Sequence, residues 1–211
     1  MIERDRFKAA IEKALLDKGK RNFTQSVEII FSFKNVDFSK PDNRLNVEVA
    51  LPKGRGKTPK VWVFAEQQMA LEAKNAGADT VVGSSEITKM AQNKKALKKL
   101  AREYVFFAQP SFMVTIGKTL GQVLASRGKL PKPIIGASVS EMIELAKRTV
   151  KIASKGKNLP VAQCAIGTEK MSVDDLVENA EAVYSRVAEK VGSENIKRIY
   201  VKLTMGKCAL V

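Results

Sequence analysis

Apolar and polar residues alternate over short runs near both ends of the chain, next to segments with helical spacing. In the N-terminal part, apolar residues recur every three or four positions up to Gly19, and alternation follows over 26–33 and 45–51. In the C-terminal part the same criteria predict three strands and one long helix, at 149–153, 159–166, 196–203 and 172–192 respectively. Such alternation is typical of antiparallel strands that are covered on one face.

The middle of the chain has a different pattern, in which short apolar runs without alternation are separated by helical segments. The runs VWVFA at 61–65, TVVG at 80–83 and YVFFA at 104–108 predict parallel strands that are covered on both faces. Ser138 and Glu141 form a capping pair that predicts a further helix. This order of strands and helices predicts a Rossmann-like α/β unit.

The two patterns together predict the domain organisation. Neither terminal part holds enough elements to bury a core alone, but the two parts combined do. We therefore expect a mixed α/β (α+β) chain with two domains. A discontinuous domain with an antiparallel sheet and helices is predicted over 1–60 and 150–211, and a Rossmann-like α/β domain is inserted at 61–149.

Composition narrows the range of functions. The 37 Lys and Arg residues against 22 Asp and Glu residues give a formal net charge of +15, which favours a polyanionic partner. The chain has no histidine, which excludes histidine-based catalytic triads and histidine-ligated metal sites. Cys164 and Cys208 are too few for a four-thiolate zinc site, and we interpret both as buried, reduced side chains. We expect neither a metal ion nor another cofactor.

Targeting and nucleotide-binding signals are also missing from the sequence. The N-terminal residues match neither a signal peptide nor a membrane-spanning helix, so we expect a cytoplasmic protein without a membrane partner. Two Gly-Lys-Thr triplets begin at Gly56 and Gly117, but a phosphate-binding loop needs a glycine five positions earlier, where Leu51 and Phe112 stand. A small-molecule or phosphate-handling enzyme built on the inserted domain remains an alternative, although no convergent acid–base pair supports it.

Basic residues gather in three clusters in the discontinuous domain or at its junctions with the inserted domain. The clusters are Lys53, Arg55, Lys57 and Lys60; Lys147, Arg148, Lys151, Lys155 and Lys157; and Lys197, Arg198, Lys202 and Lys207. A solvated face explains any single cluster, but three together favour a nucleic-acid footprint. Thr204-Met205-Gly206 follows the last alternating strand, and its hydroxyl, flexible apolar side chain and glycine suit either recognition of RNA shape or a simple turn.

Several motifs occur together along the chain: NFTQSVEI at 22–29, VALPKGRGK at 49–57, GAD at 77–79, RGKLPKP at 127–133 and IYVKLTMG at 199–206. In this order and spacing they resemble the family of the universal large-subunit ribosomal protein one, the protein of the mobile stalk beside the tRNA exit site, in its archaeal form. The resemblance covers essentially the whole chain. It implies two domains, one built from both termini and one inserted.

The resemblance also implies a function, that of a non-enzymatic RNA-binding protein of the large ribosomal subunit. Members of the family bind large-subunit ribosomal RNA mainly through the discontinuous domain and assist release of deacylated tRNA from the exit site. Many also repress translation of their own messenger RNA. We expect the same partners here, and a monomer away from the ribosome. A repressor that acts only outside the ribosome is a further alternative.

Matching positions imply which residues bind RNA. Four residues match RNA-binding positions of the family directly, and these are Phe23, Thr204, Met205 and Gly206. Five lysines are assigned the same role because they are basic and lie near a family motif: Lys34, Lys53, Lys57, Lys155 and Lys157. The sequence departs from the family pattern at two places. Lys207 follows the tripeptide where bacterial members often have proline, and it would add a phosphate contact. Ala125-Ser126 stands where a Gly-Pro is common, which leaves the role of the 125–133 loop open.

Overall fold

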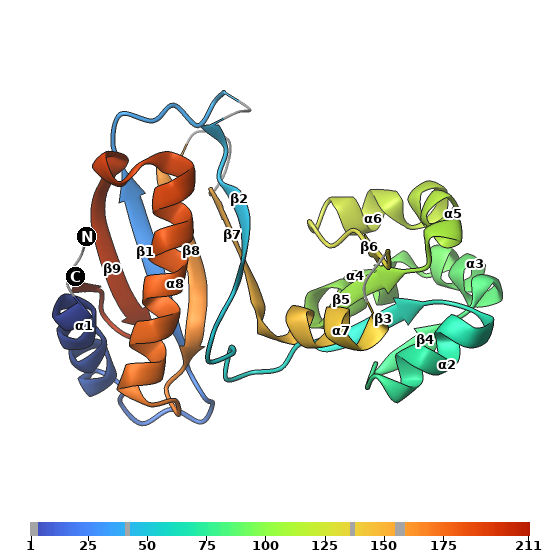
Figure 1. Ribbon diagram of the computed structural model, residues 1–211, viewed down its shortest axis with the longest axis horizontal. Helices are drawn as coiled ribbons and strands as arrows, with labels where there is room; N and C mark the ends of the chain where they lie inside the picture. Colours follow the sequence, from blue (N-terminus) through green and yellow to red (C-terminus); the bar gives the residue numbers. More distant parts are fainter. Residues whose placement is uncertain (1–3, 41–42, 136–137, 155–158) are drawn as a thin grey trace. The chain divides into compact units, whose positions relative to one another are not determined.

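The chain folds into two compact units, one of which is interrupted by the other. A computed structural model describes residues 4–40, 43–135, 138–154 and 159–211. Met1–Lys57 and Arg148–Val211 form the discontinuous unit, and Thr58–Lys147 form the inserted unit (Figure 1). The two units contain separate sheets, so each is described by itself.

The discontinuous unit contains a six-stranded sheet in the order β10-β9-β1-β8-β7-β2, and all neighbouring strands are antiparallel. The strands are β1 (Ser26–Phe33), β2 (Asn46–Ala50), β7 (Thr149–Ser154), β8 (Val161–Thr168), β9 (Ile196–Leu203) and β10 (Ala209–Leu210). The N-terminal segment supplies β1, which lies between β8 and β9 from the C-terminal segment. The sheet therefore exists only when both segments are present.

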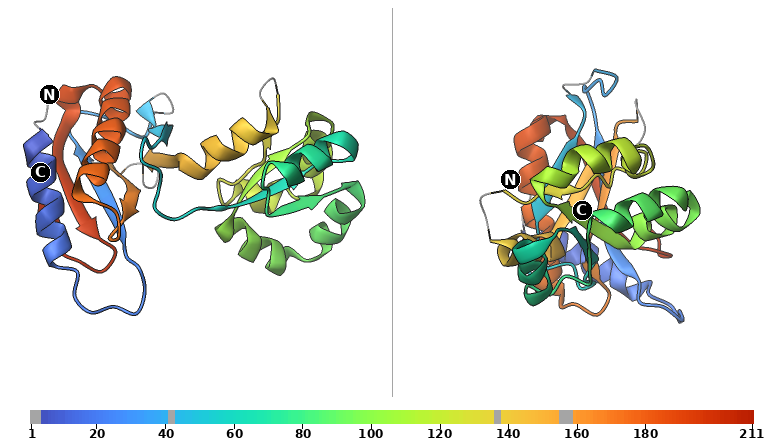
Figure 2. Two further views of the ribbon diagram at one scale, coloured as in Figure 1. Left: turned by 60° about the horizontal axis from the view of Figure 1, so that its bottom comes forward. Right: turned by 90° about the vertical axis from the view of Figure 1, so that its right-hand side faces the viewer.

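Two helices cover one face of this sheet. Helix α1 (Arg4–Leu16) and helix α8 (Val173–Val191) lie side by side there, and the ring centroids of Phe7 and Tyr184 are 6.1 Å apart (Figure 1, Figure 2). Alternate residues of β1 are buried under these helices, as its period-two pattern predicts. Ser172 accepts a hydrogen bond from the Asp175 amide at 3.1 Å and so caps α8, which ends at Gly192 with φ 88°.

The inserted unit contains a parallel sheet in the order β4-β3-β5-β6. Its strands are β3 (Lys60–Phe64), β4 (Thr80–Val82), β5 (Tyr104–Ala108) and β6 (Lys132–Pro133). Its helices are α2 (Gln67–Asn75), α3 (Ser84–Gln92), α4 (Lys94–Glu103), η2 (Pro110–Phe112), α5 (Met113–Thr119), α6 (Gly121–Ala125) and α7 (Val139–Arg148). One apolar core includes buried residues of α2 and α7, and a second includes buried residues of α3, α4, α5 and α6. Because both faces of the sheet are covered, the predicted Rossmann-like α/β arrangement and the predicted fold class are confirmed.

Several features differ from the sequence interpretation or extend it. The helices α5 and α6 and the two-residue strands β6 and β10 were not predicted. The Gly-Lys-Thr triplet at Gly117 forms the last turn of α5, whereas in a phosphate-binding loop it follows a glycine-rich loop and begins a helix. Cys164 is buried as expected, but the expectation is wrong for Cys208, whose side chain is exposed after β9. None of the helices in the described part of the chain is long and apolar enough to cross a membrane.

Candidate nucleic-acid interface

The six-stranded sheet has two ends, at which different loops meet. We call one the Thr204 end, where β1 begins and β8 and β9 finish; it comprises segments 17–25, 51–57, 169–172 and 204–208. We call the other the Lys34 end; it comprises segments 34–40, 43–45 and 192–195. Strand β1 joins the two ends and has 8 residues, so the ends are roughly 25 Å apart at about 3.3 Å per residue.

The structure places most of the sequence-predicted RNA-binding residues at one of these ends. Phe23, Lys53, Lys57, Thr204, Met205 and Gly206 lie at the Thr204 end. Lys34 lies at the opposite end, where its backbone amide donates to the Asn195 carbonyl at 2.8 Å. Lys155 and Lys157 fall outside the described residues. The basic and motif residues therefore do not form one continuous patch.

The turn after β9 is tied to the start of β1 through Thr204. The Thr204 amide donates to the Ser26 carbonyl at 3.1 Å, and the Ser26 amide donates to the Thr204 hydroxyl at 3.1 Å. The hydroxyl is thus occupied within the protein, where it extends the strand pairing by one step. Met205 follows and is 60% exposed. Thr204 positions the turn, and Met205 presents an apolar contact surface.

Gln25 is a buried hydrogen-bond centre behind this turn. It is only 1% exposed, and its side-chain oxygen accepts from the Met205 amide at 3.1 Å. Its side-chain nitrogen donates to the Lys18 carbonyl at 2.8 Å and to the Glu169 carboxylate at 3.3 Å. Gln25 thereby connects three segments that are far apart in the sequence. Because a buried amide must find partners, these bonds fix the relative positions of the segments.

Gly206 allows a second close approach in the same turn. The Lys207 amide donates to the Asp17 carboxylate at 2.6 Å. A Cβ atom on Gly206 would lie 3.1 Å from the Leu203 Cβ and 3.4 Å from that carboxylate. A larger residue would press on Leu203 at the end of β9, so this position favours glycine.

The loop that carries the LPKGRGK motif is held by Asn179, which is fully buried in α8. Its side-chain oxygen accepts from the Lys53 amide at 3.0 Å, and its nitrogen donates to the carbonyls of Gly54 and Ile166 at 2.9 and 2.8 Å. Gly56 adopts φ +65°, and a Cβ there would lie 2.6 Å from the Thr168 hydroxyl. The loop is therefore packed onto the end of β8 and is not a free tether.

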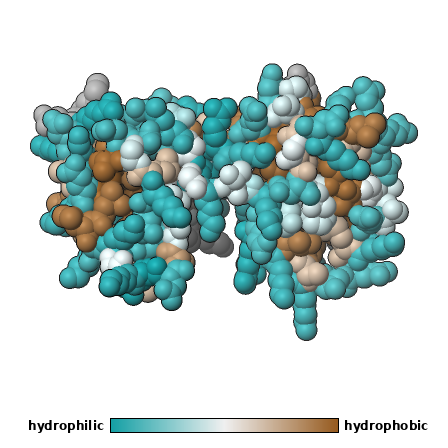
Figure 3. Space-filling view, turned by 90° about the horizontal axis from the view of Figure 1, so that it is seen from below, coloured by the Kyte–Doolittle hydropathy of each residue, from teal (hydrophilic) through white to brown (hydrophobic). Residues whose placement is uncertain are grey.

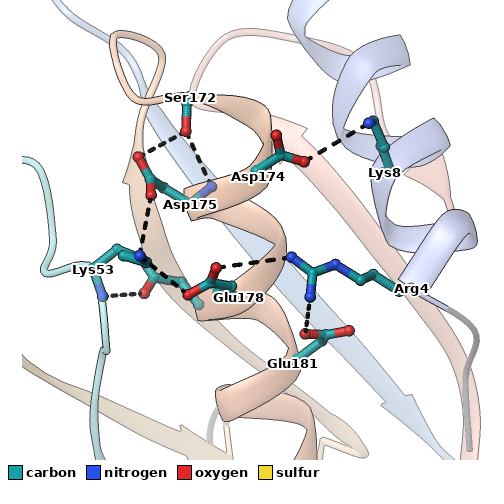
Figure 4. A network of polar contacts seen from close by, with 9 residues as sticks. Arg4, Lys8, Lys53, Ser172, Asp174, Asp175, Glu178 and Glu181 are labelled. Atoms are coloured by element: carbon teal, nitrogen blue, oxygen red, sulfur yellow. Dashed lines mark hydrogen bonds and ion pairs between the residues drawn. The ribbon is translucent and has the colours of Figure 1, made fainter.

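The cations of this loop are not equivalent. The Lys53 ammonium lies 3.5 Å from Glu178 and 3.9 Å from Asp175, both on α8 (Figure 4). The Arg55 guanidinium donates to the Thr149 carbonyl at 3.4 Å, and partial burial lowers its pKa from the ordinary value, although it stays charged near neutral pH. Lys57 is exposed. Part of the positive charge of the loop is thus already compensated by α8.

Large apolar side chains are exposed at this same end. Phe23 is 50% exposed and Leu16, at the end of α1, is 87% exposed. Figure 3 views the chain from below, the side on which β1 begins and β9 ends in Figure 1, and apolar surface is visible there among hydrophilic side chains. Exposed apolar groups on braced loops beside cations are typical of a contact surface for a structured partner. Within the described ranges, no group of three or more acidic or cysteine side chains could hold a metal ion.

Sequence reasoning missed Gln25, Asn179 and Asp17, which hold these loops in place. The role of Asn179 could have been predicted from the sequence, because it is a polar residue at a position where the helical spacing places buried apolar residues, and a buried polar side chain needs hydrogen-bond partners. Gln25 lies within the NFTQSVEI motif, but nothing in that motif shows its pairing with Met205. Asp17 had no signal, because its partner Lys207 is distant in the sequence.

Comparison with known proteins identifies the family. Residues 12–207 match the Ribosomal protein L1p/L10e family. The chain is 48% identical to "Large ribosomal subunit protein uL1" of Thermofilum pendens over 94% of this chain and 89% of that protein. It is 44% identical to the protein of the same name from Methanocella arvoryzae over 96% of both chains. It is 41% identical to that of Methanothermococcus thermolithotrophicus over 100% of this chain and 99% of the relative. Because these matches span nearly the whole chain, the protein belongs to the ribosomal protein L1 family, and the expectation that it is not an enzyme is confirmed.

Proposed function

We propose that this chain is a component of the large ribosomal subunit and binds a structured region of large-subunit ribosomal RNA through the Thr204 end of its sheet. The observation that carries the proposal is the bracing of this end. Gln25 and Asn179 hold loops from distant parts of the chain, and the loops present exposed apolar and cationic side chains. A surface whose loop backbones are fixed in this way can distinguish RNA shapes, because its loops do not rearrange to fit any polyanion.

The two kinds of side chain have different roles. Phe23 and Met205 are exposed and apolar, and they pack against bases and sugars of the RNA that match their positions. Lys57 and Lys207 contact phosphates and release counterions, which gives affinity for any RNA and a strong salt dependence. Phosphate contacts position the RNA, whereas the apolar contacts select it.

The remaining lysines extend this scheme. Lys34 lies at the other end of the sheet, so it reaches phosphates of an RNA that spans roughly 25 Å. Lys155 and Lys157 were predicted as phosphate contacts, and this stays a prediction.

Two finer roles belong to the same proposal. The chain assists release of deacylated tRNA from the exit site, and it represses translation of its own messenger RNA by binding a mimic of the ribosomal site in that RNA. Both require only that one shape-specific surface accept a second RNA.

The test compares Met205→Ala with Leu71→Ala, an exposed leucine of α2 in the inserted unit and so on neither end of the six-stranded sheet. Affinity is measured for a transcript of the mobile-stalk region of large-subunit RNA and for a scrambled transcript of equal length. We expect Met205→Ala to weaken binding of the stalk transcript roughly tenfold and to leave binding of the scrambled transcript unchanged. Leu71→Ala should affect neither. Equal loss for both transcripts would contradict the assignment. Repeating the measurement with the chain's own messenger leader and with deacylated tRNA tests the two finer roles.

A further inference from the structure

A hollow of about 290 Å³ opens beside the Thr204 turn. Lys13, Leu16 and Asp17 at the end of α1 form one side, and Lys207, Cys208 and Ala209 form the other. Its lining includes Lys207, two residues after Met205, so it adjoins the turn assigned above to RNA. Its volume is at the small end of the range for ligand pockets, so it fits one flat ring system and not a larger cofactor.

The walls of the hollow combine three kinds of chemistry. Leu16, Cys208 and Ala209 supply apolar surface for the face of a ring. Lys13 and Lys207 add positive charge to its lining. The Asp17 carboxylate is held in orientation by the Lys207 amide at 2.6 Å, and a carboxylate of this kind still has lone pairs for further donors.

We propose that this hollow receives one unstacked base of the RNA bound at the Thr204 end, and that the base is guanine. The inference rests on the proposed function, because it deepens the same site. Structured RNA exposes unstacked bases in loops and bulges, and proteins take up such bases between apolar side chains while reading their Watson–Crick edge. The lysines contact the phosphates on either side of the base and offset the negative charge of Asp17.

The choice of guanine follows from the chemistry of Asp17. An ionised carboxylate can only accept hydrogen bonds. Guanine presents two neighbouring donors on its Watson–Crick edge, the ring N1–H and the exocyclic amino group, and these match the two oxygens of a carboxylate. Uracil presents a single donor between two carbonyl oxygens, which the carboxylate repels. Adenine and cytosine each present one amino group next to an acceptor nitrogen.

Cys208 provides a direct probe of whether the hollow is filled. Cys208 is exposed, whereas Cys164 is buried and its pKa is raised to about 12 by burial, so iodoacetamide at pH 8 reacts with Cys208 alone. We expect the stalk transcript at saturating concentration to slow alkylation of Cys208 at least tenfold. A chain with Cys208→Ser and Leu71→Cys carries the thiol on α2 of the inserted unit, and its alkylation should not change.

Specificity is tested by replacing each unpaired guanine of the transcript with adenine, one at a time. One replacement should weaken binding roughly tenfold and restore alkylation of Cys208. Asp17→Asn keeps an acceptor for the Lys207 amide but replaces one oxygen with a donor. This variant should lose the discrimination between that guanine and adenine while still binding the transcript.

Three results separate the proposals. Tight binding of the transcript without protection of Cys208 would overturn the base pocket and leave the proposed function standing. Protection that persists through every guanine replacement would also overturn the pocket, because RNA then merely covers the thiol. Absence of selective binding to the stalk transcript would overturn the proposed function and the pocket with it.

Discussion

The two ends of the six-stranded sheet both carry lysines, yet they are built differently. At the Thr204 end, side-chain hydrogen bonds connect residues that are more than a hundred positions apart, such as Gln25 with Met205 and Asn179 with Lys53. At the Lys34 end, the described side-chain hydrogen bonds are local, such as Asn195 to the Val191 carbonyl and Asn43 to the Asp37 carbonyl. Charge alone does not distinguish the two ends. Bracing by distant segments makes one of them a surface of fixed shape.

The largest expected effect comes from removing the brace of the LPKGRGK loop. Asn179→Ala leaves the Lys53 amide and two carbonyls without their partner in a buried place, and each unsatisfied group costs about 1–3 kcal/mol. We expect the discontinuous unit to lose about 3 kcal/mol of unfolding free energy. Asn195→Ala, at the other end, removes one local hydrogen bond and should cost about 1 kcal/mol.

The measurement for this pair is urea unfolding followed by far-ultraviolet circular dichroism. The single tryptophan, Trp62, lies in β3 of the inserted unit, so its fluorescence serves as an internal control that neither substitution should change. Equal destabilisation by both substitutions would show that the two ends do not differ in bracing.

A second, intermediate effect concerns Gln25. Gln25→Leu keeps the size of the side chain but removes its bonds to the Met205 amide and the Lys18 carbonyl. We expect roughly tenfold weaker binding of the stalk transcript, with binding of scrambled RNA unchanged, because the charges stay in place while the turn is released. Gln163→Leu alters an exposed glutamine within β8 and is the matched control. If Gln25→Leu kept the selectivity for the stalk transcript over scrambled RNA, bracing by Gln25 would not be the cause of that selectivity.

The smallest expected effect separates two lysines of one loop. The Lys53 ammonium is shared with Glu178 and Asp175, whereas Lys57 is exposed. RNA must compete with α8 for Lys53, so Lys53→Ala should change the affinity less than Lys57→Ala does. In a plot of log affinity against log salt concentration, Lys57→Ala should reduce the slope by about one phosphate contact. A larger slope change for Lys53→Ala would mean that its ion pairs open when RNA binds.

Periodicity in the sequence was sufficient for the fold and for part of the site. Alternation over 196–203 predicted β9 at its observed bounds, and the continuous runs predicted the parallel strands. The helices over 113–125 were not predicted, because Gly117 and Gly121 have low helix propensity and break the pattern, although the apolar spacing is helical. The two-residue strands form only because a neighbouring strand is present, which no local pattern reports.

The candidate site, like the fold, could be predicted only in part from the sequence. The Thr204 tripeptide and the LPKGRGK motif could be found as contiguous residues. The polar side chains that hold them could not, because Gln25 and Met205 are 180 positions apart in the sequence and meet only in the folded chain. The exposure of Cys208 was missed for a related reason. A cysteine beside a short apolar run gives no sign of whether it faces the core or solvent.

The central place of β1 in the sheet has a consequence for synthesis of the chain. Translation produces β1 early, but its partners β8 and β9 follow only after the whole inserted unit has been made. The strands of the inserted unit all lie within 58–147, so they can pair before β8 and β9, the partners of β1, have been synthesised. At about 5–20 residues per second, that delay lasts on the order of ten seconds. A chain that is released before Lys207 therefore lacks the turn whose amide binds the Asp17 carboxylate, and its Thr204 end stays unfinished.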